Sequence, residues 1–168
     1  ILNPDGSFNT TCGNPALRRL TEGPPALVLA DAEVSASGQA IAVSQKDIRA
    51  IQLAKGALKA GIDMLLVAGG YQRPRQIMLA GAFGSYLAKE DVLTIGMFPP
   101  VRATQIAIMG NAAGVGAVRY LLEATAQQRI DAIRSATEVV HLATDPAFQQ
   151  AFIASLSFPL PQHTAHSA

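Results

Sequence analysis

The sequence predicts an α/β fold, a layered sheet with helices, in which strands and helices alternate along the chain. Two apolar runs, at 77–80 and 105–109, have the length of buried strands, and each is followed by a glycine and a helical segment. Between the N-terminal region and these runs, residues 44–67 have the periodicity of one long helix. Strands that alternate with helices are typical of layered α/β structures.

The N-terminal part of the chain predicts an irregular segment followed by a hairpin. Residues 1–25 are dense in glycine, proline and asparagine, which favour turns, with one helical turn expected at 17–20. The short apolar runs at 26–30 and 40–43 are separated by polar residues and glycine, as in a β-hairpin.

The C-terminal part predicts three helices and a strand. Asn111 and Asp145 are suited to cap helix starts, and Pro146 is favoured at a first helical position. We expect helices at 112–123, at 126–136 and from 146 onward, and a strand at 139–142. The expected organisation is an irregular segment 1–25, a lobe 26–158 and a disordered tail 159–168.

Composition excludes several classes of function. The 168 residues are 49% hydrophobic, which is enough for one compact core. The net charge of +1 creates no field that would gather nucleic acid or anionic lipid, so neither is expected as a partner. The longest apolar runs fall far short of the roughly 20 residues that a membrane span requires.

The single cysteine and the first residue bear on compartment and chain extent. Cys12 alone builds neither a disulfide framework nor a four-cysteine iron–sulfur site, and we expect a reducing, cytoplasmic location. The chain begins at Ile1 with no signal segment after it, so we expect the natural start of the protein to lie upstream.

The long helix contains a lysine on an apolar arc. Ser44 and Asp47 form a capping-box pattern at its start, and the helix is expected to be buried over most of its surface. Lys55 lies between Ile51 and Leu58 on the apolar arc. Two interpretations stay open: the lysine extends its ammonium to water along its aliphatic stem, or it lines a cleft and donates hydrogen bonds to a polar ligand.

A glycine loop follows the first buried strand. Gly81-Ala82-Phe83-Gly84-Ser85 brings backbone N–H groups and small residues to one point, which suits a ribose or phosphate but also suits a simple tight turn. The loop matches neither the dinucleotide fingerprint nor a P-loop. For Gly110, Gly114 and Gly116 we expect close helix packing.

The chain contains no complete catalytic set. No aspartate begins an Asp-x-Gly loop of the kind that holds Mg²⁺ in phosphoryl transfer. His141 falls in an apolar run, and His163 and His166 fall in the tail, which argues against a catalytic triad or a histidine-rich metal site. We therefore expect neither catalytic nor metal-ligating residues in this chain.

Five separated motifs resemble one known family. These motifs are Ser44–Arg49, Gln52–Ala57, Leu79–Leu87, Gly110–Gly114 and Leu142–Phe148. They resemble the C-terminal ATPase region of the reductive activators of corrinoid proteins, over nearly the whole chain after residue 25. That family belongs to the superfamily of acetate and sugar kinases, heat-shock ATPases and actin, so the resemblance implies one lobe of an actin-like (ribonuclease H-like) ATPase fold.

The resemblance also implies an adenosine site. The loop at 81–85 is similar to the superfamily's adenosine loop, although a second glycine usually stands where this chain has Ala82. The helix segment at 52–55 is similar to a helix whose polar residues hold ribose and adenine in the chaperones. The implied site consists of Gln52, Lys55, Lys59, Gly81, Ala82, Phe83, Gly84 and Ser85.

The function that the resemblance implies belongs to a larger protein. Family members reduce cob(II)alamin to cob(I)alamin in a corrinoid protein, using ATP and a [2Fe–2S] cluster. The Mg²⁺ and cluster sites lie in parts that this chain lacks, so it would bind ATP or ADP without being catalytic alone. Two alternatives stay open: a docking or homodimerisation module, and an activator of another low-potential enzyme such as a radical dehydratase.

Overall fold

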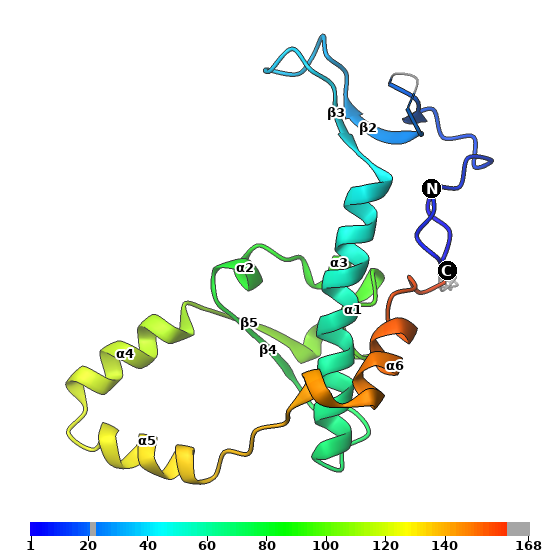
Figure 1. Ribbon diagram of the computed structural model, residues 1–168. Helices are drawn as coiled ribbons and strands as arrows, with labels where there is room; N and C mark the ends of the chain where they lie inside the picture. The colour runs from blue at the N-terminus through cyan, green and yellow to red at the C-terminus, as the bar shows by residue number, and fades with distance from the viewer. Residues whose placement is uncertain (21–22, 161–168) are drawn as a thin grey trace, which may run out of the picture.

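One long helix organises the computed structural model, which describes residues 1–20 and 23–160 (Figure 1). This helix, α1, runs over Gln45–Ala68, and its 24 residues extend about 36 Å. The predicted capping box is confirmed: the Ser44 hydroxyl accepts a hydrogen bond from the Asp47 backbone N–H, and the Asp47 carboxylate accepts one from the Ser44 backbone N–H. These reciprocal bonds satisfy two donors that a helix start otherwise leaves unpaired.

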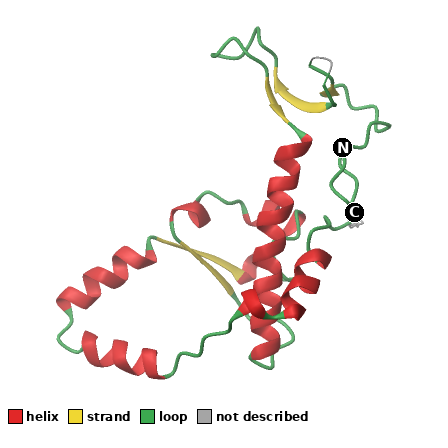
Figure 2. Ribbon diagram, in the orientation of Figure 1, coloured by secondary structure: helices red, strands yellow, loops and turns green. Residues whose placement is uncertain are grey.

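A small antiparallel sheet lies at the N-terminal end of α1 (Figure 2). Its strands are β1 (Leu17–Arg18), β2 (Ala26–Ala30) and β3 (Ile41–Val43). Pairing of β2 with β3 confirms the predicted hairpin. The predicted helical turn at 17–20 is wrong, because residues 17 and 18 pair with β2 and satisfy their backbone groups in a ladder instead.

Two parallel strands form the second sheet, as the apolar runs predict. They are β4 (Ile77–Ala80) and β5 (Ile106–Gly110), paired from Ile77 opposite Ile106 onward. The connection between them contains α2 (Ala82–Ser85), α3 (Lys89–Thr94) and the 3₁₀ turn η1 (Ala103–Gln105). Because the strands are parallel, their carboxyl ends and the glycine turns that follow lie at one edge of the sheet.

The C-terminal part is helical. Helices α4 (Ala112–Leu122) and α5 (Ala126–Ser135) lie apart from α1, and α6 (Pro146–Ala154) packs along it (Figure 1). The predicted strand at 139–142 is wrong: this stretch is extended and ends in the 3₁₀ turn η2 (Leu142–Thr144). A strand needs a neighbour for its backbone groups, and no strand among residues 1–20 and 23–160 pairs with this stretch.

The hydrophobic core lies between the parallel pair and α3. Its buried centre consists of Val92, Met97, Phe98 and Ile106. Ile62 of α1 packs against this cluster from the long helix. The core therefore fixes β5, the segment after α3 and one turn of α1 relative to one another.

The face of α1 that is buried differs from the prediction. The apolar arc remains largely open, with Ile51 43% exposed, Leu58 45% and Leu65 53%. The buried residues instead centre on the adjoining side of the helix, and they are Ile48 and Lys55 at the edge of the apolar arc, followed by Gln52, Gly56 and Ala60. Helical periodicity aligned the apolar residues correctly, but it did not predict which side of the helix the rest of the described chain covers.

The two chain ends cover the polar stripe of α1, which is the side of the helix that carries Gln45, Gln52 and Lys55. The backbone N–H of Phe158 donates to the carbonyl of Pro4 at 2.8 Å, which joins the ends to each other. At the start of α1, the Gln45 amide donates to the Gly6 carbonyl and accepts from the Phe8 N–H. The predicted disordered tail lies, from residue 161 on, outside the described residues. No helix in the described ranges is long and apolar enough to cross a membrane.

Candidate functional site

Two glycine turns meet at the carboxyl edge of the parallel pair. Gly81 follows β4 with φ +93°, and Gly110 ends β5 with φ +60°, both in the left-handed region that favours glycine. The Gly81 backbone N–H donates to the Gly110 carbonyl at 2.7 Å. This hydrogen bond joins the two turns and fixes the backbone of both loops relative to the sheet.

The backbone of both turns is accessible. A Cβ built on Gly81 or Gly110 meets no heavy atom within 4 Å. Glycine is therefore favoured at these positions by the left-handed backbone conformation and not by close packing. Gly84 differs, because a Cβ there would lie 3.1 Å from the Cβ of Leu79. Ala82 is exposed, and Phe83 and Ser85 continue the short helix α2. A flat or polar ligand group therefore has room to approach this edge at two positions.

A helix begins at each turn. Asn111 caps α4 as predicted, its side-chain carbonyl accepting from the Gly114 N–H at 2.9 Å. A Cβ at Gly114 would lie 2.6 Å from the Asn111 amide nitrogen, so glycine at this position makes room for the cap. The expected close packing of Gly116 is not found, since a Cβ built on it would have no heavy atom within 4 Å. In α/β sheets, ligands bind at such carboxyl edges, where helix N-termini favour negative charge.

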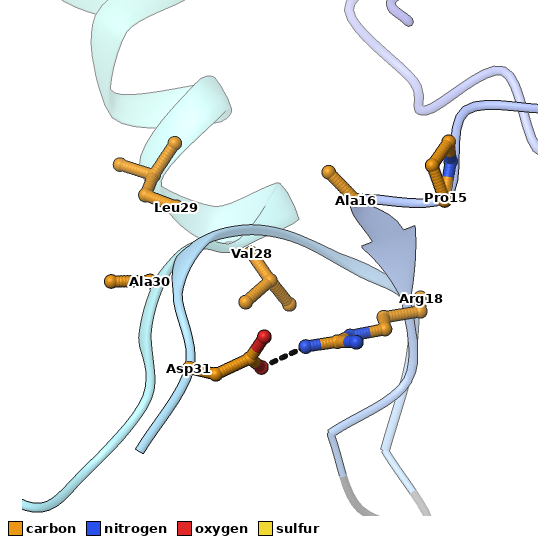
Figure 3. Close-up of a pocket in the computed structure, with 7 residues that line it drawn as sticks. All are labelled: Pro15, Ala16, Arg18, Val28, Leu29, Ala30 and Asp31. Carbon is orange, nitrogen blue, oxygen red and sulfur yellow. Dashed lines mark hydrogen bonds and ion pairs between the residues drawn. The ribbon is translucent and has the colours of Figure 1, made fainter. Parts of the chain in front are cut away.

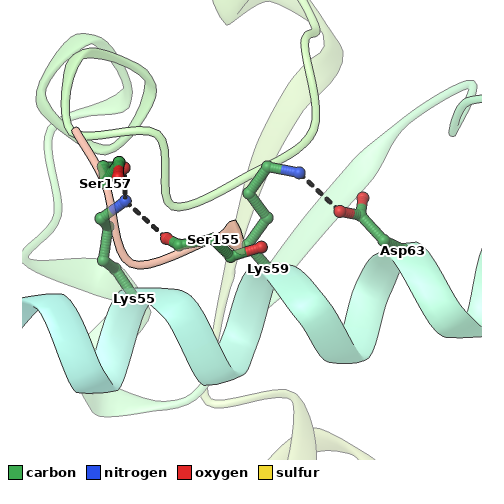
Figure 4. A network of polar contacts seen from close by, with 5 residues as sticks. All are labelled: Lys55, Lys59, Asp63, Ser155 and Ser157. Atoms are coloured by element: carbon green, nitrogen blue, oxygen red, sulfur yellow. Dashed lines mark hydrogen bonds and ion pairs between the residues drawn. The ribbon is translucent and has the colours of Figure 1, made fainter. Parts of the chain in front are cut away.

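Lys55 is enclosed by the C-terminal segment. Its side chain is 1% exposed, and its ammonium donates to the carbonyls of Ser155, at 2.8 Å, and Ser157, at 2.5 Å (Figure 4). The Phe158 ring centroid lies 5.1 Å from the same nitrogen, a cation–π distance. The interpretation that Lys55 reaches solvent is therefore wrong: carbonyl dipoles and a ring face replace water around its charge.

Burial also changes the titration of this lysine. Removal from water, and to a smaller extent the charge of Lys59, lower the pKa of Lys55 below its ordinary value. No carboxylate forms an ion pair with Lys55 among the described residues. The charge is held by two carbonyl hydrogen bonds and the Phe158 ring, without a neutralising carboxylate.

Gln52 joins both chain ends to the helix. Its amide nitrogen donates to the carbonyls of Asp5 and Leu156, each at 3.0 Å, and its amide oxygen accepts from Arg49 at 2.8 Å. All of these contacts are internal. Gln52 thus acts as a clamp between the N-terminal segment, α1 and the C-terminal segment.

Lys59 faces a different place. Its ammonium pairs with Asp63 one helical turn on, at 2.5 Å (Figure 4), and it lines a groove beside residues that precede β4 and β5. That groove is at the amino edge of the parallel pair, whereas Gly81 is at the carboxyl edge.

The loop residues expected in one adenosine cleft therefore lie apart from the three helix residues expected there. The loop 81–85 is at the carboxyl edge, Gln52 and Lys55 are under the C-terminal segment, and Lys59 is at the amino-edge groove. Helical spacing correctly aligned the three polar residues on one stripe of α1. It could not reveal which segment of the chain covers that stripe.

Two hollows of the described surface differ in size and charge. The smaller, of about 240 Å³, lies beside β2, and its ion pair between Arg18 and Asp31 neutralises the charge there (Figure 3). The larger is the amino-edge groove, of about 1310 Å³, and it is strongly basic. The sequence reading missed this groove, although Arg73 and Arg75 just before β4 and Arg102 just before β5 were visible signals.

Metal ligands do not gather anywhere in residues 1–20 and 23–160: no group of three His, Cys, Asp or Glu side chains is close enough to hold an ion.

Comparison with known proteins identifies the family. The sequence matches the family described as the C-terminal domain of RACo, the ASKHA domain, over residues 1–167. It is 36% identical over 123 residues to the corrinoid activation enzyme RamQ of Eubacterium limosum, covering 72% of this chain and 21% of RamQ. The structure superimposes with a TM-score of 0.79 on a reductive activator for corrinoid, iron-sulfur protein, at 27% identity, covering 95% of this chain and 26% of the other.

These matches confirm the predicted family resemblance and the predicted α/β, actin-like fold class. The chain spans about a fifth of the curated relative and about a quarter of the solved one. The chain belongs to the family of the C-terminal ASKHA domain of RACo.

Proposed function

We propose that this chain is the nucleotide-binding lobe of an ATP-dependent activator of corrinoid proteins, acting in the cytoplasm. The adenosine side of ATP or ADP binds at the carboxyl edge of β4 and β5, against Gly81, Ala82, Phe83, Gly84 and Ser85. The observation that supports this most directly is the pair of joined left-handed turns at Gly81 and Gly110 with open space above both.

The residues at this edge fit a nucleotide. Glycine lets a flat ring or a ribose approach the backbone where any side chain would intervene. The start of α4, capped by Asn111, provides the positive end of a helix dipole for an anionic group. In this proposal Gln52 and Lys55 act indirectly, because their described contacts bind the two chain ends to α1.

The names of the relatives support the activity that we propose for the whole protein. RamQ is a corrinoid activation enzyme, and the solved relative is a reductive activator for a corrinoid, iron-sulfur protein. For this protein we infer one-electron reduction of cob(II)alamin to cob(I)alamin in a corrinoid partner, with ATP-linked closure of the two lobes providing the driving force.

The remaining cofactors belong to other parts of the protein. With one cysteine, this chain does not bind a [2Fe–2S] cluster, and it lacks the Asp-x-Gly loops that hold Mg²⁺ near phosphates. We assign both to regions outside this chain. The contribution of this lobe is to bind and orient the nucleotide.

The test compares glycine substitutions with equal backbone strain. Gly81→Val and Gly110→Val place a branched side chain in the approach path, and Gly38→Val is the matched control, because Gly38 also has a left-handed φ, +65°, and open space, but lies in the β2–β3 loop. In the whole protein we expect ATP binding, measured by calorimetry, to weaken at least tenfold in the first two variants only. ATPase rate and cobalamin reduction, followed by absorbance, should fall in parallel.

The control also separates folding from binding. All three variants carry the cost of a side chain at positive φ, so similar melting temperatures are expected. If Gly81→Val binds ATP as tightly as Gly38→Val does, the adenosine site lies elsewhere.

One observation supports a second role in docking or dimerisation. Helix α4 has no buried residue, and its exposed apolar side chains include Leu121 and Leu122, each 80% exposed. A surface of this kind is typical of an interface. If it joins two copies of the protein, Leu121→Lys should shift the sedimenting species from dimer to monomer, while Ile133→Lys on α5, 63% exposed, should not.

A further inference from the structure

The amino-edge groove is a second candidate binding site, separate from the glycine turns. It lies where the chain enters β4 and β5, at the sheet edge opposite Gly81. Its volume of about 1310 Å³ exceeds the roughly 300–1,000 Å³ of most small-molecule pockets. Its lining combines one lysine and three arginines with several apolar side chains and four prolines.

The charge of the groove is uncompensated. Arg73, Arg75 and Arg102 are exposed, and no carboxylate of the described chain lines the groove or pairs with these guanidinium groups. The fourth cation, Lys59, is neutralised by Asp63. Three guanidinium groups therefore remain available to an anionic ligand.

An exposed hydrogen-bond bridge joins the backbone of two of these arginines. The Gln105 amide nitrogen donates to the Arg75 carbonyl, and its amide oxygen accepts from the Arg102 backbone N–H, both at 3.0 Å. One side chain thus ties the segment before β4 to the segment before β5. Two exposed cations on joined segments, with no carboxylate lining the groove, favour an anion on this part of the surface.

The floor of the groove indicates which kind of anion fits. Leu93, Phe98 and Val101 provide apolar surface, and four lining residues are prolines, which have no backbone N–H. Small phosphates are usually held by converging backbone N–H groups, which prolines cannot supply. Arginine pairs through two parallel hydrogen bonds with carboxylates and phosphates alike, so the preference for carboxylates rests on the prolines and the apolar lining.

We propose that this groove binds an acidic peptide segment of a partner protein, with carboxylates on the arginines and apolar side chains on the floor. Charge complementarity and the proline-rich apolar floor both favour this occupant. The inference is independent of the nucleotide proposal, because the two sites lie at opposite edges of the sheet. The proposed nucleotide site contains none of the groove residues Arg73, Arg75, Arg102 and Gln105.

The test uses the whole protein and a labelled probe. A fluorescein-labelled twelve-residue peptide of alternating glutamate and leucine is titrated at low salt and followed by fluorescence anisotropy. We expect the double variant Arg75→Gln, Arg102→Gln to bind at least tenfold more weakly. The control is Arg119→Gln with Arg134→Gln, which removes the same charge from exposed arginines of α4 and α5. Added salt should weaken binding in the wild type more than in the groove variant.

Further arms distinguish the alternatives. Gln105→Ala keeps all arginines but removes the bridge, and a several-fold loss with an unchanged melting temperature would support its positioning role. A peptide with glutamine in place of glutamate should bind at least tenfold more weakly than the acidic probe. The proposal is overturned if the wild type does not bind the probe, if both double variants bind equally, or if the glutamine peptide binds as tightly. Displacement of the probe by an equal concentration of inorganic triphosphate would instead assign the groove to a small phosphate ligand.

Discussion

The ammonium of Lys55 lies 2.8 Å from the carbonyl oxygen of Ser155, a residue 100 positions later in the chain. A second bond to the Ser157 carbonyl encloses the charge under the C-terminal segment. The lysine that interrupts the apolar arc of α1 is thus an anchor for the end of the domain. The ammonium group forms hydrogen bonds where an apolar side chain would form a van der Waals contact. These bonds require α1 and the segment 155–157 to lie in this alignment.

Replacing this anchor should loosen the C-terminal segment. Lys55→Met keeps the length of the side chain but leaves two carbonyls without their donor, which costs about 1–3 kcal/mol of local stability. Amide hydrogen exchange at 155–158 in the whole protein should accelerate accordingly. Lys59→Met is the control, since its surface pair with Asp63 is worth only about 0.3–0.5 kcal/mol.

The same variant tests the direct adenosine role that the family resemblance implied. If Lys55 contacts the nucleotide, Lys55→Met should weaken ATP binding without accelerating exchange at 155–158. If it is an anchor, Lys55→Met should accelerate amide exchange at 155–158. ATP affinity should then fall only to the extent that the loosened segment disturbs the rest of the lobe. Unchanged exchange together with lost ATP affinity would contradict the anchor.

The lowered pKa of Lys55 predicts a pH dependence of stability. Because burial lowers the folded-state pKa below the unfolded value of 10.5, the unfolded chain holds this proton more tightly at alkaline pH. Stability should therefore rise, relative to Lys55→Met, as the pH increases from the folded pKa toward 10.5, and should level off above it. Unfolding of both proteins between pH 7 and 11 measures this difference, and a difference that is constant or falls with pH would contradict the lowered pKa.

Substitution by alanine should change the thermal stability differently at two glycines of α1, Gly56 and Gly61. Alanine in a helix interior gains about 1 kcal/mol over glycine. At Gly61 the new Cβ would meet only Leu142 at 3.5 Å, an ordinary contact, so Gly61→Ala should stabilise the protein. At Gly56 it would lie 3.0 Å from Leu156, so crowding against the segment after α6 should offset the gain. Thermal denaturation should rank Gly61→Ala above Gly56→Ala, and the reverse order would show that α1 and α6 are less tightly packed here.

The N-cap of α1 should be sensitive to acid. Ser44→Ala removes a cap of typical strength, about 0.5–2 kcal/mol, and should increase hydrogen exchange in the first turn. Hydrogen bonds from the Ser44 hydroxyl and then its N–H lower the pKa of Asp47, so this stabilisation is complete above pH 3.8 and is lost as the pH falls through the folded pKa. The exchange difference between wild type and variant should shrink in acid, whereas Ser35→Ala in the β2–β3 loop should leave the first turn unchanged at any pH.

Local patterns predicted most elements of the fold because their causes are local. The capping box at Ser44, the cap at Asn111 and the proline start of α6 depend on neighbouring residues alone, and each is confirmed. The prediction of a strand at 139–142 was wrong because strand formation depends on distant residues. Its apolar residues suit a strand, but a strand requires a partner that the chain did not supply in the described part.

The sequence by itself determined the family, the α/β class and the glycine turns at 81 and 110, because a left-handed backbone and a helix cap need particular residues at particular positions. Only the tertiary structure decided what covers the polar stripe of α1 and that Gln105 joins the backbone before β4 to the backbone before β5. Those relationships join residues far apart in the chain, and helical or strand periodicity contains no information about which distant segment fills a given face.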